Sequence, residues 1–526
     1  MNNRIQILDC TLRDGGYCNE WRFGASNIRR IIHGLADANV DIIECGFLNH
    51  RISYQNDVSK FSCMTQVMPF IKDIKEEKKY VLMANYGELD IDKLEMRGQN
   101  TVDGIRVAFH KKDLKEAMQL CQQIKDKGYD VFVQAMVSLS YSDAEFLELI
   151  QKANELVPYA FYIVDSFGVM KQNDLIRLFY LVEHNLDASI KVGYHSHNNL
   201  QLAYSNAQAL VGIETTRELI LDSSVMGMGR GAGNLNTELF LEYVNHAKGA
   251  HYDLKPILRL IDEIINKFYQ ENYWGYSLPN YLSAKHNIHP NYAKYLSDKN
   301  TLMVADMDMI FDRIEPNKCV NYDKNYIENL YITYMKKGEV NAERLCAFTQ
   351  SLQGKKVVLI APGKSSETEK EKILSFIEAP NVVAISVNFD YKGKTDYIFV
   401  SNIRRFKALD CALHEKVVAT SNIDVNDCFV KVDYAELINN ADRVSDNAGL
   451  MLIRLLIKLG IKEVNLAGFD GYSYNSEQNY GETKMELTYR KEDLDALNAG
   501  MCSVFKEYSK QIKMSFITPT RLEFEV

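Results

Sequence analysis

The amino-acid sequence predicts an α/β protein with an N-terminal (β/α)8 TIM barrel, a helical extension and a C-terminal Rossmann-like α/β domain. Two observations predict the barrel. Short β-rich runs alternate with helical periodicity from about residue 4 to residue 239, and eight such units suit a barrel of about 240 residues. Polar residues also gather directly after these runs, where a parallel barrel carries its active site. A doubly wound open sheet is the structural alternative.

The β-rich runs of the first half recur at intervals that leave room for one helix each. Helical patterns follow them, for example over 25–39 and 143–156. This alternation predicts parallel strands joined by crossover helices. The expected strands are 5–8, 41–46, 80–84, 104–107, 130–136, 161–165, 190–194 and 219–222.

A chain of 526 residues is too long to fold around one compact core, so two or three domains are expected. We expect the barrel over 1–250, a helical, aromatic-rich extension over 251–350 and the Rossmann-like domain over 355–526. The net charge of -9 gives no electrostatic reason to expect nucleic acid as a partner. No apolar run is long enough to predict a membrane span.

The cysteines and the start of the chain predict a cytoplasmic protein. The 10 cysteines are scattered without a Cys-x-x-Cys pair, which favours reduced thiols. The sequence after Met1 lacks the basic segment and apolar core of a signal peptide.

Two histidines, His195 and His197, directly follow the run 190–194. Alternate side chains of a strand share one face, so we expect both imidazoles to chelate one metal ion. Arg13 and Asp14 follow the first run, and the carboxylate completes the set. Two imidazoles and one carboxylate make an open divalent-metal site, suited to Mn, Fe, Co or Zn and, with added oxygens, Mg. The histidines taken alone are equally consistent with a solvated loop.

Further polar residues follow other runs of the predicted barrel: Glu44, Asp165, Ser166 and Asn234. Asn234 belongs to the glycine-rich stretch 222–238, which precedes a helix expected near Asn236. Its glycines allow the backbone to approach a ligand such as a phosphate or carboxylate, although tight barrel closure would also use them.

The segment from about 252 to 347 is mostly helical and rich in tyrosine. Aromatic runs of this kind are typical of packing or of a dimer surface, and we expect a homodimer.

The second half of the chain returns to alternating patterns. Runs at 357–361, 382–387, 397–400, 417–420 and 463–467, with a helix over 447–459, predict the Rossmann-like sheet. The loop 361–366 contains Gly-Lys-Ser, but Val358 stands where a Walker A loop requires glycine. The stretch 468–472, Gly-Phe-Asp-Gly-Tyr, follows a strand, where a ligand site of such a sheet lies.

Four motifs of the first half occur together and in order: Thr-Leu-Arg-Asp-Gly at 11–15, Ile-Glu-Cys-Gly at 43–46, His-Ser-His-Asn at 195–198 and Gly-Arg-Gly-Ala-Gly-Asn at 229–234. They resemble the metal-dependent lyases and synthases on the (β/α)8 barrel, the group of 3-hydroxy-3-methylglutaryl-CoA lyase, isopropylmalate synthase and 4-hydroxy-2-oxovalerate aldolase. The resemblance covers about the first 285 residues.

The resemblance implies a role for each motif. Asp14, His195 and His197 would bind the metal, Mn or Mg, with Asn234 as a fourth ligand in some branches of the group. The guanidinium Arg13 would stabilise an enolate oxygen and Glu44 would orient the groups around the metal. A Lewis acid that chelates a 2-oxo acid lowers the cost of a carbanion beside the carbonyl.

Ser166 favours the pyruvate aldolases within this group, where the resemblance implies that a serine holds the pyruvate carboxylate. Gly229 to Asn234 is also shorter than the lyases' catalytic loop and contains no cysteine. One departure concerns Tyr17, which stands where these aldolases place a histidine general base. Their catalytic tyrosine beyond the barrel has several candidates, Tyr276 and Tyr281 among them.

The expected function is therefore a metal-dependent aldolase that joins or separates a 2-oxo acid and an aldehyde. The C-terminal unit resembles Rossmann-like modules of bacterial surface-glycan proteins, which implies a nucleotide or sugar ligand there and a sugar-derived aldehyde. Two other functions remain open: an acyl-CoA-dependent synthase of the isopropylmalate or homocitrate type, and a binding module on an inactive barrel.

Overall fold

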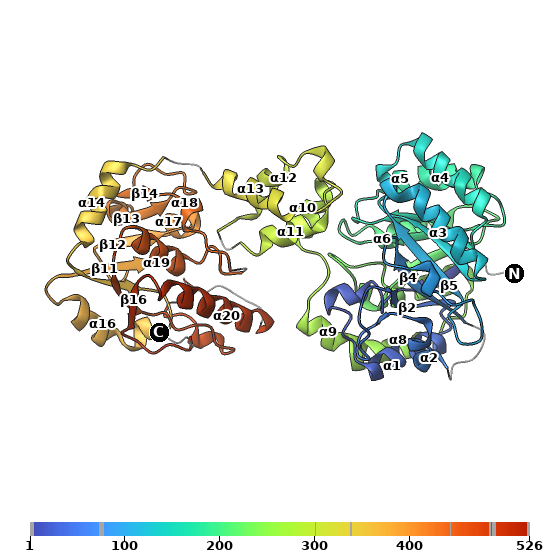
Figure 1. Cartoon of the computed structure of the whole chain (residues 1–526), viewed down its shortest axis with the longest axis horizontal. Helices are drawn as coiled ribbons and strands as arrows, with labels where there is room; N and C mark the ends of the chain where they lie inside the picture. The colour runs from blue at the N-terminus through green and yellow to red at the C-terminus, as the bar shows by residue number, and fades with distance from the viewer. Residues whose placement is uncertain are drawn as a thin grey trace. The chain divides into compact units, whose positions relative to one another are not determined.

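The computed structural model describes residues 5–72, 78–299, 301–336, 339–441, 443–482, 485 and 491–522. The chain forms two compact units, one of Met1–Pro290 with Pro316–Asn321 and one of Asn291–Glu315 with Tyr322–Val526. Each unit contains its own parallel sheet, so the predicted α/β class is confirmed (Figure 1). Among the described residues, no helix combines the length and the apolar character needed to cross a membrane.

The first unit is the predicted parallel barrel. Pairing of β1 with β2 closes the sheet in the order β1-β9-β8-β7-β6-β5-β4-β2, and β3 pairs with the outer end of β2. All eight expected barrel strands are present, with ends that differ by one or two residues. The strands are β1 Ile5–Asp9, β2 Ile42–Leu48, β3 Lys60–Phe61, β4 Lys79–Asn85, β5 Gly104–Phe109, β6 Asp130–Ala135, β7 Ala160–Asp165, β8 Lys191–Ser196 and β9 Leu219–Ser223.

Helices follow the barrel strands and bury their apolar faces against them. In α4, Ser142 and Glu145 form a capping box that satisfies the free amides of the first turn. The helices of this unit are α1 Ala25–Asp37, α2 Met68–Ile71, α3 Leu114–Asp126, α4 Asp143–Leu156, α5 Gln172–Asn185, α6 Ala203–Gly212, α7 Thr237–Lys248, α8 Leu254–Leu260, α9 Asn266–Glu271 and α10 Leu278–Lys285.

The strand period of two divides each barrel strand between two environments. Outward residues such as Ile7 and Val107 pack in the core that the strands share with the helices. Inward residues such as Leu8, Phe132 and Ile220 form a separate apolar cluster inside the barrel. The same alternation places the polar residues Glu44, Arg106, His195 and Asp222 on inward positions, which gives the site a rigid support.

The second unit contains a seven-stranded parallel sheet in the order β14-β13-β12-β11-β10-β15-β16. The order reverses direction between β10 and β15, as it does at the switch point of a doubly wound sheet. The strands are β10 Lys356–Ile360, β11 Val382–Val387, β12 Tyr397–Val400, β13 Val417–Thr420, β14 Val430–Val432, β15 Glu463–Ala467 and β16 Lys513–Phe516.

The helices of the second unit come from both the tyrosine-rich segment and the C-terminal region. Helix α19 has eight buried residues and packs against β11 and β12. They are α11 Pro290–Ser297, α12 Val304–Phe311, α13 Lys324–Met335, α14 Ala342–Leu352, α15 Ser365–Thr368, α16 Lys370–Ile377, α17 Ile403–Lys407, α18 Tyr434–Leu437, α19 Ala448–Lys458 and α20 Lys491–Tyr508.

Three strands lie outside the sequence expectations: β3, β14 and β16. They span two to four residues, too few for a period of two to stand out in the sequence. Each forms an edge of its sheet, where pairing with one neighbouring strand decides the conformation.

Candidate metal centre

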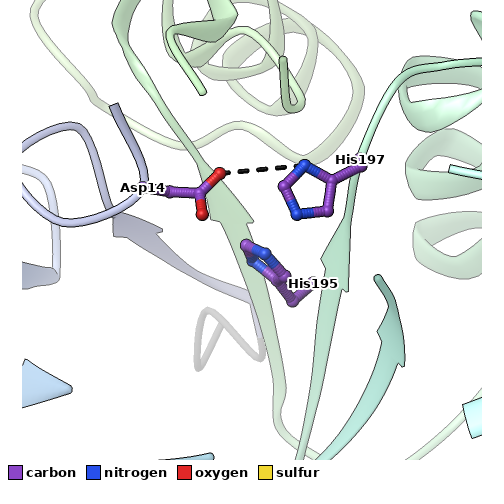
Figure 2. A group of neighbouring side chains, drawn as sticks. All are labelled: Asp14, His195 and His197. Atoms are coloured by element: carbon purple, nitrogen blue, oxygen red, sulfur yellow. Dashed lines mark ion pairs between the residues drawn. The ribbon is translucent and has the colours of Figure 1, made fainter. Parts of the chain in front are cut away.

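Three buried side chains meet at the carboxyl ends of β1 and β8. Asp14 lies in the turn after β1, His195 lies in β8, and His197 follows the end of that strand. One ligand atom from each residue lies within 4.8 Å of the others. Figure 2 shows the three side chains pointing toward one another. The structure thus brings together the three residues that the sequence analysis selected as metal ligands.

The protonation states of these residues suit a cation. Burial lowers the pKa of His197 to about 3, and Arg230 and His195 add to that effect, so the imidazole is neutral at pH 7. Burial acts to raise the pKa of Asp14, but Arg13 and the two histidines outweigh it and hold the pKa below its ordinary value. The centre therefore offers a carboxylate and neutral imidazole nitrogen.

Asn234 lies beside this group in the glycine-rich loop. Its Nδ2 donates to Asp14 Oδ2 at 2.7 Å, whereas its Oδ1 is buried without a hydrogen-bond partner among the described residues. Backbone pairing between His197 and Asn234 holds the loop against the end of β8. A Cβ atom on Gly229 would lie 2.7 Å from Asp14 Oδ2, so this position requires glycine. The loop glycine therefore permits the close approach of Asn234 to the centre.

Arg13 connects the centre to Glu44. Its Nη1 donates to Asp14 Oδ1 at 2.6 Å and its Nε donates to Glu44 Oε2 at 2.8 Å. Burial acts to lower the pKa of Arg13, but the two carboxylates raise it well above its ordinary value. The remaining nitrogen, Nη2, is buried and has no hydrogen-bond partner in the described part of the chain. Arg13 thus keeps a permanent charge and a donor that no described residue uses.

Arg106 and Asp222 complete a buried charge network that sequence reasoning missed. Arg106 Nη1 forms an ion pair with Glu44 Oε1 at 2.9 Å, and its Nη2 pairs with Asp222 Oδ2. Asp222 Oδ2 also lies 2.9 Å from His195 Nδ1. A single charged residue inside the apolar strand 104–109 was the available sequence signal for Arg106.

The network supports a cation in two ways. It holds three carboxylates and two guanidiniums, which leaves one negative charge uncompensated inside the barrel. The hydrogen bond to Asp222 also occupies His195 Nδ1, so Nε2 is the atom left for a metal. Asn234 Oδ1 and His197 Nδ1 have no hydrogen-bond partner among the described residues, and with them the donor set fits a divalent ion.

Ser166 and Asp165 lie at the end of β7 and have different surroundings. Ser166 Oγ accepts a hydrogen bond from the Val137 amide at 2.9 Å, which leaves the hydroxyl proton available. Asp165 accepts hydrogen bonds from the amides of Val169 and Met170 at 2.9 and 3.0 Å. Asp165 therefore closes the turn after β7 and takes no part in the metal centre.

Arg230 links several residues around the centre. It donates to the Ser166 carbonyl at 2.9 Å, and its guanidinium carbon lies 5.6 Å from the ring centroid of Tyr17. His289, which follows α10, packs edge-on against Phe167. Burial lowers the pKa of His289 to about 3, with further lowering by Arg230, so it is neutral at pH 7. The tyrosines proposed from the sequence, Tyr276 and Tyr281, have exposed side chains.

Comparison with known proteins yields related sequences for about half of the chain. Residues 4–264 match the family model described as HMGL-like. The 4-hydroxy-2-oxovalerate aldolase of Geobacillus thermodenitrificans is 26% identical over 266 residues, covering 50% of this chain and 75% of its own. The enzyme of that name from Carboxydothermus hydrogenoformans is 28% identical over 276 residues, covering 50% and 78%.

A solved structure, the N-terminal domain of a presumed aldolase from Bacteroides vulgatus, is 27% identical with a TM-score of 0.48. Its match covers 56% of this chain and 97% of that chain.

Proposed function

Because residues 4–264 belong to the HMGL-like family of lyases and aldolases, we propose that the first unit is a divalent-metal-dependent aldolase. It forms or cleaves a 4-hydroxy-2-oxo acid through the enolate of pyruvate and an aldehyde. The related 4-hydroxy-2-oxovalerate aldolases support this reaction class.

The observation that carries the proposal is the free Nη2 of Arg13 beside the three candidate ligands. A bound divalent metal, Mn or Mg, supplies a Lewis acid that polarises the carbonyl of a 2-oxo acid. Arg13 then places a fixed positive charge where the enolate oxygen develops, and it needs no reorganisation because Asp14 and Glu44 hold it. Burial of the whole group keeps water from weakening this interaction.

Three other side chains have supporting roles in the proposed reaction. The hydroxyl of Ser166 donates to the pyruvate carboxylate, since its own acceptor function is already used by Val137. Glu44 orients Arg13 through the 2.8 Å hydrogen bond to its Nε. Asn234 orients Asp14 and offers Oδ1 as a further metal ligand.

The aldehyde is proposed to be sugar-derived, because the same chain carries a second α/β unit with a pocket of its own. A homodimer is also part of the proposal. The exposed aromatic side chains Tyr273, Tyr276 and Tyr281 lie close together in the sequence after the barrel and supply a surface for it. Sedimentation that shows only the 60.3 kDa monomer would remove the dimer.

Deuterium exchange of pyruvate tests the proposed enolate. The protein is incubated with pyruvate in deuterated buffer with Mg²⁺ or Mn²⁺, and deuterium in the methyl group is measured by mass spectrometry. We expect exchange that needs the metal, stops with a chelator and is lost in His195→Ala. Arg13→Lys is expected to retain metal and to slow exchange about 10² to 10³-fold, the usual cost of one lost charge-stabilising donor.

The control for this experiment is His246→Ala, because His246 is an exposed histidine on α7. It should exchange pyruvate at the wild-type rate. Exchange that persists in His195→Ala would contradict the proposed site. Release of free CoA thiol from acetyl-CoA and a 2-oxo acid, without pyruvate exchange, would instead establish the acyl-CoA-dependent synthase.

A further inference from the structure

A pocket lies at the carboxyl edge of the sheet in the second unit. Its wall is formed by residues that follow β10, β11, β12 and β15, namely 361–363, 388, 401–402 and 468–472. These strands include β10 and β15, between which the strand order reverses. Open parallel sheets bind their ligands at this point, because neighbouring loops diverge there and leave a crevice. The pocket therefore lies where the topology of this sheet places a binding site.

The two loops at the switch point pack tightly against each other. The Gly363 amide donates to the Gly468 carbonyl at 3.1 Å, and a Cβ atom on Gly468 would strike the Ala361 backbone. Asp470 accepts a hydrogen bond from the Ser365 amide at 2.6 Å and also pairs with the Ser365 hydroxyl. The Gly-Lys-Ser loop thus already has a carboxylate of the protein at the position where a phosphate-binding loop holds phosphate.

Asp446 also lines this pocket and carries a buried oxygen without a hydrogen-bond partner among the described residues. Asp446 Oδ2 accepts hydrogen bonds from the amide and the hydroxyl of Thr301, each at 2.9 Å. Its other oxygen, Oδ1, is buried and has no hydrogen-bond partner among the described residues, and the whole residue is only 2% exposed. A buried carboxylate oxygen without a donor costs free energy. A ligand hydroxyl in the pocket would remove that cost.

Two groups that attract anions line the same pocket as Asp446. The first turn of α19, including Ala448 and Gly449, lines the pocket, and the amides of a helix N-terminus attract anions. Arg405 from α17 lines the same pocket, and its Nη2 donates to the Met485 carbonyl at 2.9 Å. The helix amides and the Arg405 guanidinium favour a ligand with an anionic group, and Asp446 favours one with a hydroxyl.

The remaining wall of the pocket is aromatic. Phe469, Tyr472 and Tyr480 line it, and such rings pack against sugar or base faces. The cavity has a volume of about 160 Å³ and opens to the surface, so a bound ligand extends from the cavity into its open mouth. From these groups we propose that the second unit binds a hydroxylated organic anion, a sugar phosphate, nucleotide or acidic sugar, with a hydroxyl on Asp446 and the anionic group near Arg405.

Calorimetric titration of the full-length protein tests the site. The probes are the four common nucleoside monophosphates, glucose 1-phosphate, glucuronate, glucose and inorganic phosphate. We expect saturable binding of at least one probe that has both hydroxyls and an anionic group, and weaker or no binding of glucose and phosphate. The member that binds identifies the source of the anion. Absence of saturable binding by every such probe would overturn the proposal.

Two variants then place the ligand in the pocket. Asp446→Asn retains one oxygen for Thr301 but replaces the other oxygen with an amide donor, and Arg405→Gln removes the charge. Each is expected to weaken binding about tenfold or more, the usual effect of losing a hydrogen bond to a charged group. The control Glu436→Gln changes an exposed carboxylate on α18 and should bind as the wild type does. Unchanged affinity in Asp446→Asn would overturn the proposal.

The binding test is independent of the proposed aldolase reaction. His195→Ala should bind the same probe with wild-type affinity, because its substitution lies in the first unit. A protein that binds the probe but does not exchange pyruvate would contradict the proposed aldolase reaction alone. A protein that exchanges pyruvate but binds no probe would contradict the proposed ligand site of the second unit alone.

Discussion

His195 Nδ1 lies 2.9 Å from Asp222 Oδ2, and this carboxylate also pairs with Arg106 inside the barrel. Burial acts to raise the pKa of Asp222, but Arg106 and His195 outweigh it and lower the pKa below its ordinary value. Asp222 is therefore ionised, and it holds the proton of His195 on Nδ1. This relationship decides which nitrogen of His195 is available to a metal.

Asp222→Asn should weaken metal binding about 10 to 100-fold, the usual effect of losing a partner that orients a ligand histidine. The asparagine is nearly the same size but lacks the charge that selects the tautomer of His195. Titration with Mn²⁺ measures the affinity. Asp187→Asn, an exposed carboxylate that precedes β8, serves as the matched control and should bind metal normally. Equal affinities in the two variants would show that Asp222 does not orient His195.

Arg106→Met should destabilise the first unit by about 3–5 kcal/mol, because it leaves Glu44 and Asp222 buried without their shared cation. Urea unfolding, monitored with the metal removed, measures the change. Arg97→Met breaks a partly exposed ion pair with Asp103, so its effect should stay within about 1 kcal/mol. If Arg106→Met lowered the free energy of unfolding as little as Arg97→Met does, water or a rearrangement would have to stabilise Glu44 and Asp222 in place of Arg106.

The metal-free protein should lose stability as the pH falls from about 6.5 toward 3, in part through His197. Its pKa in the folded protein is about 3, against an ordinary value of 6.5. The unfolded chain therefore binds the additional proton in this range, and protonation favours unfolding. Above about pH 6.5 both states are neutral at this residue and its contribution no longer changes.

Other buried groups titrate in the same range, and Asp165 has the opposite sign because burial raises its pKa to about 6. His197→Gln isolates the contribution of one residue. Its unfolding free energy, measured with chelator at pH 7 and pH 5, should fall less than that of the wild type. His246→Gln, on the exposed side of α7, should follow the wild type. If the His197→Gln variant lost as much stability as the wild type between pH 7 and pH 5, His197 would not contribute to the pH dependence.

Gly229→Ala should impair metal binding while leaving the fold intact. The added methyl group would lie 2.7 Å from Asp14 Oδ2 and against Asn234, so the loop must move away from the centre. We expect at least about a tenfold weaker Mn²⁺ affinity, in the range found for lost supporting contacts at metal sites. Gly212→Ala is the control because nothing lies within 4 Å of its added Cβ. Normal binding by Gly229→Ala would show that the loop is not part of the centre.

Local sequence patterns were sufficient to predict the eight barrel strands and the positions of the three candidate metal ligands. A period of two places His195 and His197 on one face, and the end of the first strand places Asp14 at the same edge of a closed parallel sheet. Short edge strands were missed because a few residues carry no period. Ser166 and Asn234 also follow strands of the barrel, and their roles stay predictions.

The sequence by itself therefore determined the α/β class, the barrel and the three residues that meet at the candidate metal centre, because strand periodicity and strand ends are local properties. Only the tertiary structure decided which buried polar and charged groups pair with one another. Arg106 and Asp222 are 116 positions apart, and Thr301 and Asp446 are 145 apart. No local pattern encodes such pairs, because their energies arise only when burial removes water and leaves each charge dependent on its partner.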